Sequence, residues 1–161
     1  MNSRILAIIT LALIPVGVRA GNPETKYNGD GYVFYGVGQP PGGGATLQQI
    51  GGGGEGFLYK GLAAGAELGY QYSTEGFSYG IGILSLNGSY HFGRSRKVVP
   101  FVTGGYSLAF RGGHANLYNF GGGVTWWIAK HIGVRVDARD YVWPSRCSPH
   151  SPQFTMAVSF R

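Results

Sequence analysis

Hydrophobic and polar residues alternate along most of the chain, in segments of about ten residues separated by turn-forming residues. In the stretch HIGVRVDARDYV at 131–142, aliphatic residues alternate with Arg135, Asp137 and Arg139. A period of two residues predicts a β-strand with one apolar face and one charged face. The alternation alone leaves open which face is buried, because soluble sheets and membrane barrels both show it.

The same alternation occurs in eight segments, and no segment after residue 20 has a helical stripe or an apolar run long enough for a membrane helix. The predicted strands are 32–39, 47–58, 62–72, 78–92, 98–110, 116–128, 132–142 and 153–160. Two kinds of connection alternate between them, one rich in glycine, proline and serine, the other short and basic. This arrangement predicts an up-and-down antiparallel barrel with both termini at the end that holds the short basic turns.

The composition of the two faces predicts which of them meets lipid. One face is aliphatic and aromatic, whereas the other is built from Gly, Ser, Thr, Asn and Gln with few charges. A soluble barrel turns many charged residues toward water, so the second face fits a narrow lumen and the apolar face is expected to contact lipid. Aromatic residues lie where the two girdles of a transmembrane barrel are expected, namely Tyr70, Tyr72, Phe110, Tyr118 and Trp143 at one end and Tyr59, Tyr90, Phe92, Trp126 and Phe160 at the other.

The overall composition agrees with an exported membrane barrel. Charged residues make up only 12% of the 161 residues and aromatic residues 14%, which excludes a disordered chain and is a poor match to a soluble surface. Residues 1–20 are predicted to be a cleaved signal peptide, because Arg4 precedes an apolar run that ends near small residues, and 21–161 then form one barrel domain. Positive charge is spread along the chain, so no nucleic-acid partner is expected. Cys147 is the single cysteine, which excludes an intramolecular disulfide.

The charges of 131–142 are predicted to point into the lumen. Glu55 and Glu67 share the inward face of their strands, so an ion-pair network of Glu55, Glu67, Arg135, Asp137 and Arg139 is expected there. On the lipid face, one Arg at the bilayer midplane would cost about 2–4 kcal/mol. The same residues could instead gate a narrow ion path, but eight strands leave an interior just wide enough for side chains, which favours a plugged lumen.

Candidate catalytic residues are few. The glycine run at 51–56 lacks the Lys-Ser/Thr of a phosphate-binding loop, and the four histidines share no metal-ligand spacing, so neither a cofactor nor a metal is expected. His114 and His150 fall on predicted loops, with serines 145, 148 and 151 nearby in sequence. A serine and a histidine from these loops could form a catalytic Ser–His pair. No carboxylate stands beside either histidine to orient it, so an enzyme is not predicted.

The chain resembles the bacterial outer membrane protein beta-barrel domain family, the small eight-stranded barrels of the OmpA and OmpX kind. The resemblance rests on GGGGEGFLYKGLAAGAELGYQY at 51–72, VVPFVTGGYSLAF at 98–110 and NFGGGVTWWIAKHIGVRVDARDYV at 119–142. The end FTMAVSFR also resembles the C-terminal strand signal that barrel-assembly machinery reads, with Phe160 as the terminal aromatic after Phe154, Met156 and Val158. Arg161 departs from that signal by following the aromatic residue.

The resemblance implies an all-β, eight-stranded antiparallel up-and-down transmembrane β-barrel in the outer membrane of a Gram-negative bacterium. Its implied partners are outer-membrane lipid and the barrel-assembly machinery, and a monomer is expected. The function expected first is a structural or interaction role, with a narrow pore as a secondary role. Two alternatives remain open, a secreted lipocalin-like barrel that binds a hydrophobic ligand and a lipid-modifying outer-membrane enzyme.

Overall fold

Eight β-strands form the protein in a computed structural model, which describes residues 28–161 apart from 75, 112, 146 and 147. The predicted signal peptide at 1–20 and Cys147 lie outside the described residues. The strands are β1 (Gly29–Gly38), β2 (Leu47–Tyr59), β3 (Leu62–Ser73), β4 (Gly76–His91), β5 (Val98–Phe110), β6 (His114–Trp127), β7 (Ile132–Val142) and β8 (His150–Phe160). Among the described residues, no helix is long and apolar enough to cross a membrane.

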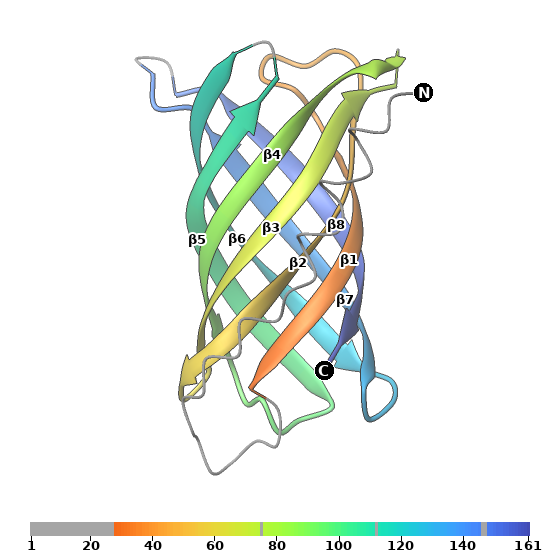
Figure 1. The fold of residues 1–161 in the computed structure, drawn as a ribbon, viewed down its shortest axis with the longest axis vertical. Coiled ribbons are helices and arrows are strands. Elements are labelled where there is room, and N and C mark those ends of the chain that lie inside the picture. Colours follow the sequence, from red (N-terminus) through yellow and green to blue (C-terminus); the bar gives the residue numbers. More distant parts are fainter. Residues whose placement is uncertain (1–27, 75, 112, 146–147) are drawn as a thin grey trace.

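The eight strands close into one antiparallel barrel, in which each strand pairs with its neighbours in sequence (Figure 1). The barrel is closed by β1 and β8, whose register runs from Gly31 opposite Phe160 to Gly38 opposite Gln153. Closure gives the backbone of every strand a hydrogen-bonding partner on both sides, so the sheet has no free edge. The predicted up-and-down barrel is therefore confirmed.

The connections lie at two distinct ends of the barrel. The short-turn end holds the connections 60–61, 92–97 and 128–131 and the last residue, Arg161, at the bottom of Figure 1. The long-loop end holds the connections that follow β1, β3, β5 and β7. The tightest described turn is Lys60–Gly61, where both residues have positive φ angles, 40° and 93°. A side chain at position 61 would meet the backbone of His91, so the turn requires glycine there.

The last hairpin is longer than the sequence predicts. Its prolines and serines indicated a loop up to residue 152, yet β8 begins at His150, which pairs with Val142. Pro149 and Pro152 do not interrupt the strand pairing, because their carbonyl oxygens accept hydrogen bonds from the residues that directly follow the neighbouring strands. The oxygen of Pro149 accepts a hydrogen bond from Trp143 N at 3.2 Å, and that of Pro152 accepts one from Gln39 N at 3.1 Å.

The inward and outward faces of the strands follow the predicted alternation. On the outside, large apolar side chains are exposed in the middle of the strands, such as Leu86 at 58% and Met156 at 63%. On the inside, polar and charged side chains are buried, with Arg135 only 3% exposed. Trp143 does not lie in the aromatic girdle as predicted. It packs against the buried apolar cluster that includes the inward-facing Tyr141.

Candidate functional site

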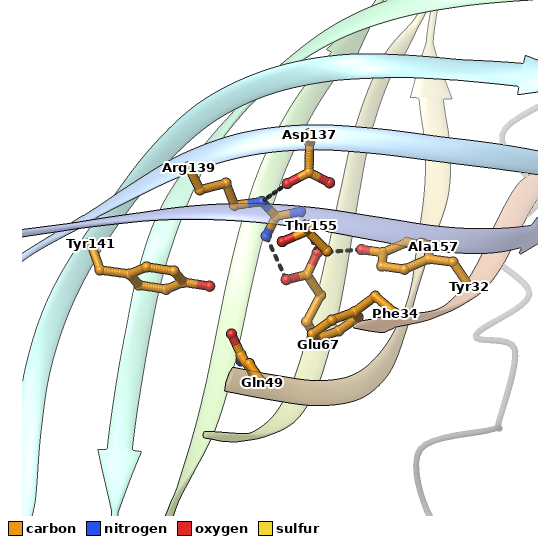
Figure 2. Close-up of a pocket in the computed structure, with 9 residues that line it drawn as sticks. All are labelled: Tyr32, Phe34, Gln49, Glu67, Asp137, Arg139, Tyr141, Thr155 and Ala157. Atoms are coloured by element: carbon orange, nitrogen blue, oxygen red, sulfur yellow. Dashed lines mark hydrogen bonds and ion pairs between the residues drawn. The ribbon is translucent and has the colours of Figure 1, made fainter. Parts of the chain in front are cut away.

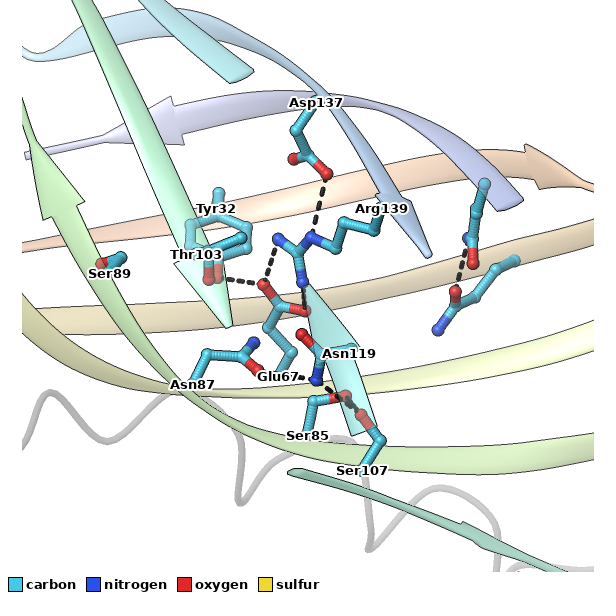
Figure 3. Close-up of polar contacts among 12 residues, drawn as sticks. Tyr32, Glu67, Ser85, Asn87, Ser89, Thr103, Ser107, Asn119, Asp137 and Arg139 are labelled. Carbon is cyan, nitrogen blue, oxygen red and sulfur yellow. Dashed lines mark hydrogen bonds and ion pairs between the residues drawn. The ribbon is translucent and has the colours of Figure 1, made fainter. Parts of the chain in front are cut away.

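Glu67 on β3 is the centre of one ion-paired group in the middle of the lumen (Figure 3). It accepts hydrogen bonds from Arg139 on β7, at 2.5 Å from Nη1 and 2.8 Å from Nη2, and from the hydroxyl of Tyr32 on β1 at 2.5 Å. All three side chains are at most 6% exposed. Because β1, β3 and β7 are not adjacent, these bonds cross the lumen and tie together three separate parts of the wall.

Glu55 on β2 is the centre of a second group. It accepts a hydrogen bond from Arg135 Nη1 at 2.8 Å and another from Ser89 Oγ at 2.6 Å, and it lies 3.1 Å from His91 Nε2. The guanidinium group of Arg135 also stacks on the ring of Phe101, 3.8 Å from its centroid. Stacking on an aromatic face partly compensates a desolvated guanidinium group.

Asp137 joins the two groups. Its Oδ1 accepts a hydrogen bond from Arg139 Nε at 3.0 Å, and its Oδ2 lies 3.5 Å from Arg135 Nε. Each guanidinium group is thus in contact with two carboxylates, and the five charged residues named from the sequence lie in one connected network. Such mutual pairing is what allows charges to remain in an interior that excludes water.

Uncharged polar side chains extend the network toward the long-loop end. Asn119 Nδ2 donates to Asn87 Oδ1 at 2.9 Å and to Ser107 Oγ at 2.8 Å, and Ser107 Oγ lies 2.7 Å from Ser85 Oγ (Figure 3). On the other side of the lumen, Gln153 donates to Gln49 at 2.5 Å. The bonds from Asn119 on β6 to Asn87 on β4 and from Gln153 on β8 to Gln49 on β2 join strands that are not direct neighbours, so they support the curvature of the wall and satisfy buried polar atoms.

Apolar side chains close the lumen above and below the network, which the sequence analysis did not predict. Near the long-loop end, Ile83, Ala109, Leu117 and Tyr141 form a buried cluster. Near the short-turn end, the buried rings are those of Phe57, Phe101 and Trp127. The inward parity of these positions is a signal that locates them, whereas the overall composition of the inward face predicts a polar lumen throughout.

The ion-paired network borders a small cavity. This cavity has a volume of about 10 Å³ and is lined by Tyr32, Phe34, Gln49, Glu67, Asp137, Arg139, Tyr141, Thr155 and Ala157 (Figure 2). That volume is about the space that one water molecule needs. A solute larger than water would therefore have to displace buried side chains in order to pass this level of the lumen.

Glycines make room for the charged side chains of the network. Four of the five charged residues have a glycine directly opposite on a neighbouring strand, the pairs being Glu55 with Gly65, Glu67 with Gly53, Asp137 with Gly123 and Arg139 with Gly121. A Cβ atom at Gly123 would lie 2.6 Å from Asp137 Cβ, and one at Gly53 would lie 2.7 Å from Glu67 Cγ. The abundance of glycine thus has a specific role in the lumen.

Gly123→Ala is expected to lower the free energy of unfolding by about 1–3 kcal/mol, because the new methyl group displaces the Asp137 side chain from its place between the two arginines. The measurement is urea unfolding in detergent micelles, followed by tryptophan fluorescence. Gly88→Ala is the matched control, since its Cβ would face outward with its nearest neighbour 3.9 Å away. Equal effects of the two substitutions would show that the lumen has room to spare at Asp137.

His150 has a carboxylate partner, contrary to the sequence-based prediction. Its Nδ1 lies 2.5 Å from Asp140 Oδ2 at the long-loop end, on the outward side of β7 and β8, and the histidine side chain is 58% exposed. The two residues are ten apart in sequence, and only the longer β7–β8 hairpin brings them together. The nearby serines hydrogen-bond elsewhere, Ser151 Oγ to Gln39 O and Ser148 Oγ to Ser145 O. The described contacts therefore form an Asp–His pair without a nucleophile bonded to it, and His114 lies exposed on β6.

Solved transmembrane barrels have the same architecture. The N-terminal β-barrel domain of Pseudomonas aeruginosa OprF matches with a TM-score of 0.59 at 14% identity, over 81% of this chain and 97% of that one. Neisserial surface protein A (NspA) matches with a TM-score of 0.59 at 12% identity, over 82% and 94%. A de novo designed transmembrane β-barrel matches with a TM-score of 0.56 at 15% identity, over 84% and 97%. The chain has the fold of a transmembrane β-barrel.

No protein-family model and no curated protein matches the sequence of this chain. The residues of the predicted assembly signal all lie on β8 and point outward, with Phe154 65%, Met156 63%, Val158 41% and Phe160 46% exposed. Because β8 pairs with both β7 and β1, these side chains stand beside the seam where the barrel closes. Recognition by assembly machinery stays a prediction for them.

Within the described residues, no group of three or more His, Cys, Asp or Glu side chains is placed to hold a metal ion.

Proposed function

We propose that the protein is an integral β-barrel of a bacterial outer membrane, with a structural or interaction role and a lumen closed to solutes. The observation that carries the proposal is the outward face of the described strands. Asp140, at the long-loop end, is the one Asp, Glu, Lys or Arg among their outward positions, while aliphatic and aromatic side chains cover the middle. An uncharged belt around the middle of the barrel suits hydrocarbon and is unsuited to water.

The interior supports a closed lumen over the alternative of a ligand-binding barrel. A lipocalin-like protein needs an apolar cavity large enough for its ligand. Here the middle of the lumen is filled by the ion-paired network, and the cavity beside it holds about 10 Å³. The same filling favours a structural role for the charges over a permanent pore.

The proposal includes no catalytic step. The Asp140–His150 pair is the feature closest to an active site, but Ser148 and Ser151 donate their hydroxyl hydrogens to backbone oxygens. The expected partners of the protein are the surrounding lipid and the barrel-assembly machinery. The residues expected to contact that machinery are Phe154, Met156, Val158 and Phe160. A monomer is sufficient, because the barrel closes within one chain.

Membrane fractionation followed by conductance measurement tests the proposal. After expression in a Gram-negative host, the protein is expected to sediment with the outer membrane and to resist extraction by carbonate. Purified and inserted into planar bilayers, it is expected to give no steady conductance steps. The double variant Glu67→Ala with Arg139→Ala removes both members of an ion pair, so neither charge is left behind without the other. Because it also widens the lumen, this variant is expected to show small conductance steps.

The two measurements test separate parts of the proposal. Recovery in the soluble periplasmic or secreted fraction would contradict the membrane assignment. Steady conductance by the unaltered protein would leave the membrane assignment standing and would contradict the closed lumen.

A further inference from the structure

Cations surround the short-turn end of the barrel. Lys60, Arg96, Lys97 and Lys130 are exposed there, and together they occupy all three short connections. We refer to these four residues as the basic ring. No ion pair of the described residues includes any of them. Their charges are therefore available to a partner outside the protein.

Two further arginines occupy the mouth inside this ring. The guanidinium carbon of Arg94 lies 3.3 Å from the ring centroid of Phe57, and that of Arg161 lies 4.0 Å from the ring of Trp127. Arg161 Nε also donates a hydrogen bond to the backbone oxygen of Lys130 at 3.2 Å. These contacts hold the two arginines over the lumen and leave the rim to the four residues of the basic ring.

The charge of the described residues is distributed unequally between the two ends. At the short-turn end, Asp30 on β1 is the one acidic side chain of the described residues outside the ion-paired network, against the basic ring and the two mouth arginines. At the long-loop end, Arg111 is balanced by Asp140, and it is held by hydrogen bonds to Tyr70 OH and Gly80 O. An excess of positive charge at one end creates a field that attracts anions to that end alone.

The basic ring lies directly beyond the lipid-facing aromatic side chains. Lys60 follows Tyr59, which is 61% exposed, and its Nζ lies 5.1 Å from the tyrosine ring centroid. Lys130 follows the outward Trp126 and Ile128, which are 51% and 58% exposed. In a membrane barrel, aromatic side chains mark the boundary between hydrocarbon and headgroups, and long cationic side chains extend from there to the phosphate level.

We infer that the basic ring binds the phosphate groups of anionic phospholipids, of the phosphatidylglycerol or cardiolipin kind, in the leaflet at the short-turn end. The inference rests on the proposed membrane location and adds a headgroup preference to it. Several cations at headgroup depth that form no ion pair among the described residues favour an anionic surface over a zwitterionic one, and this preference weakens in salt. A diffuse circle of point charges fits many small phosphate groups better than a single shaped ligand.

Electron spin resonance of spin-labelled lipids tests the inference. The full-length barrel is reconstituted in phosphatidylcholine vesicles that contain traces of labelled phosphatidylglycerol or labelled phosphatidylcholine. The motionally restricted fraction of each label reports lipid in contact with the protein. The phosphatidylglycerol label is expected to associate about threefold more strongly than the phosphatidylcholine label at low salt, and equally at high salt.

The variant Lys60→Gln/Arg96→Gln/Lys97→Gln/Lys130→Gln is expected to lose this preference, while circular dichroism checks that it remains a barrel. The matched control, Lys60→Arg/Lys97→Arg/Lys130→Arg, keeps every charge and is expected to keep the preference. Equal association of both labels with the unaltered protein, or an undiminished preference in the glutamine variant, would overturn the inference. If neither label shows a restricted fraction, the protein does not contact lipid and the proposed function itself fails.

Discussion

Glu67→Ala is expected to lower the free energy of unfolding of the barrel by about 3 kcal/mol. Glu67 accepts three hydrogen bonds, two from Arg139 and one from Tyr32, and it is 5% exposed. Its removal leaves the guanidinium end of Arg139 and a tyrosine hydroxyl buried without their acceptor. Asp137 still holds Arg139 Nε, which keeps the loss at the lower end of the range for a broken buried pair. Urea unfolding in detergent micelles, followed by tryptophan fluorescence, measures the change.

The double variant Glu67→Ala with Arg139→Ala distinguishes the energy of the ion pair from the cost of leaving one buried partner alone. Removing both partners leaves no guanidinium group to be satisfied by Glu67, so the loss is expected to fall short of the sum of the two single losses by about 0.5–3 kcal/mol. Glu67→Gln is the conservative control, since it keeps the shape and one acceptor oxygen. A loss below about 1 kcal/mol for Glu67→Ala, the value typical of exposed pairs, would mean that water reaches the network.

Leu86→Arg is expected to destabilise the barrel in phospholipid vesicles by about 2–4 kcal/mol. Leu86 lies outward on β4, opposite Ala66 and Tyr106 on the neighbouring strands, and is 58% exposed. At this level of a membrane barrel the arginine would enter hydrocarbon, where its charge has no partner. The measurement is the urea dependence of folding into vesicles.

Leu58→Arg provides the matched control near the short-turn end. Leu58 is also outward, at 40% exposure, but it stands beside Tyr59 at the end of β2, where an arginine reaches the headgroups. Its expected cost is about 0–1 kcal/mol. If both arginines were tolerated equally, the outward face would be in contact with water, and a soluble barrel with a hydrophobic ligand would again be the better hypothesis.

The sequence by itself determined the strands and their two faces. A period of two is a local property, because successive side chains of a strand point to opposite sides whatever its neighbours are. The low charge content of the apolar face predicts contact of that face with lipid, and the alternation placed Glu55, Glu67, Arg135, Asp137 and Arg139 inside the lumen. The strand bounds were less well predicted at the last hairpin, where prolines bonded through their carbonyl groups extend β8 to His150.

Only the tertiary structure decided which inward residues meet. Arg139 bonds with Glu67, 72 residues away, and Arg135 bonds with Glu55, 80 residues away, because the tilt and stagger of a closed barrel set which levels of distant strands face each other. The same geometry brings the rings of Tyr32 and Phe101 to Arg135 and places glycines opposite the charged residues. Alternation assigns each side chain to a face, but its height in the lumen depends on the register of all eight strands together.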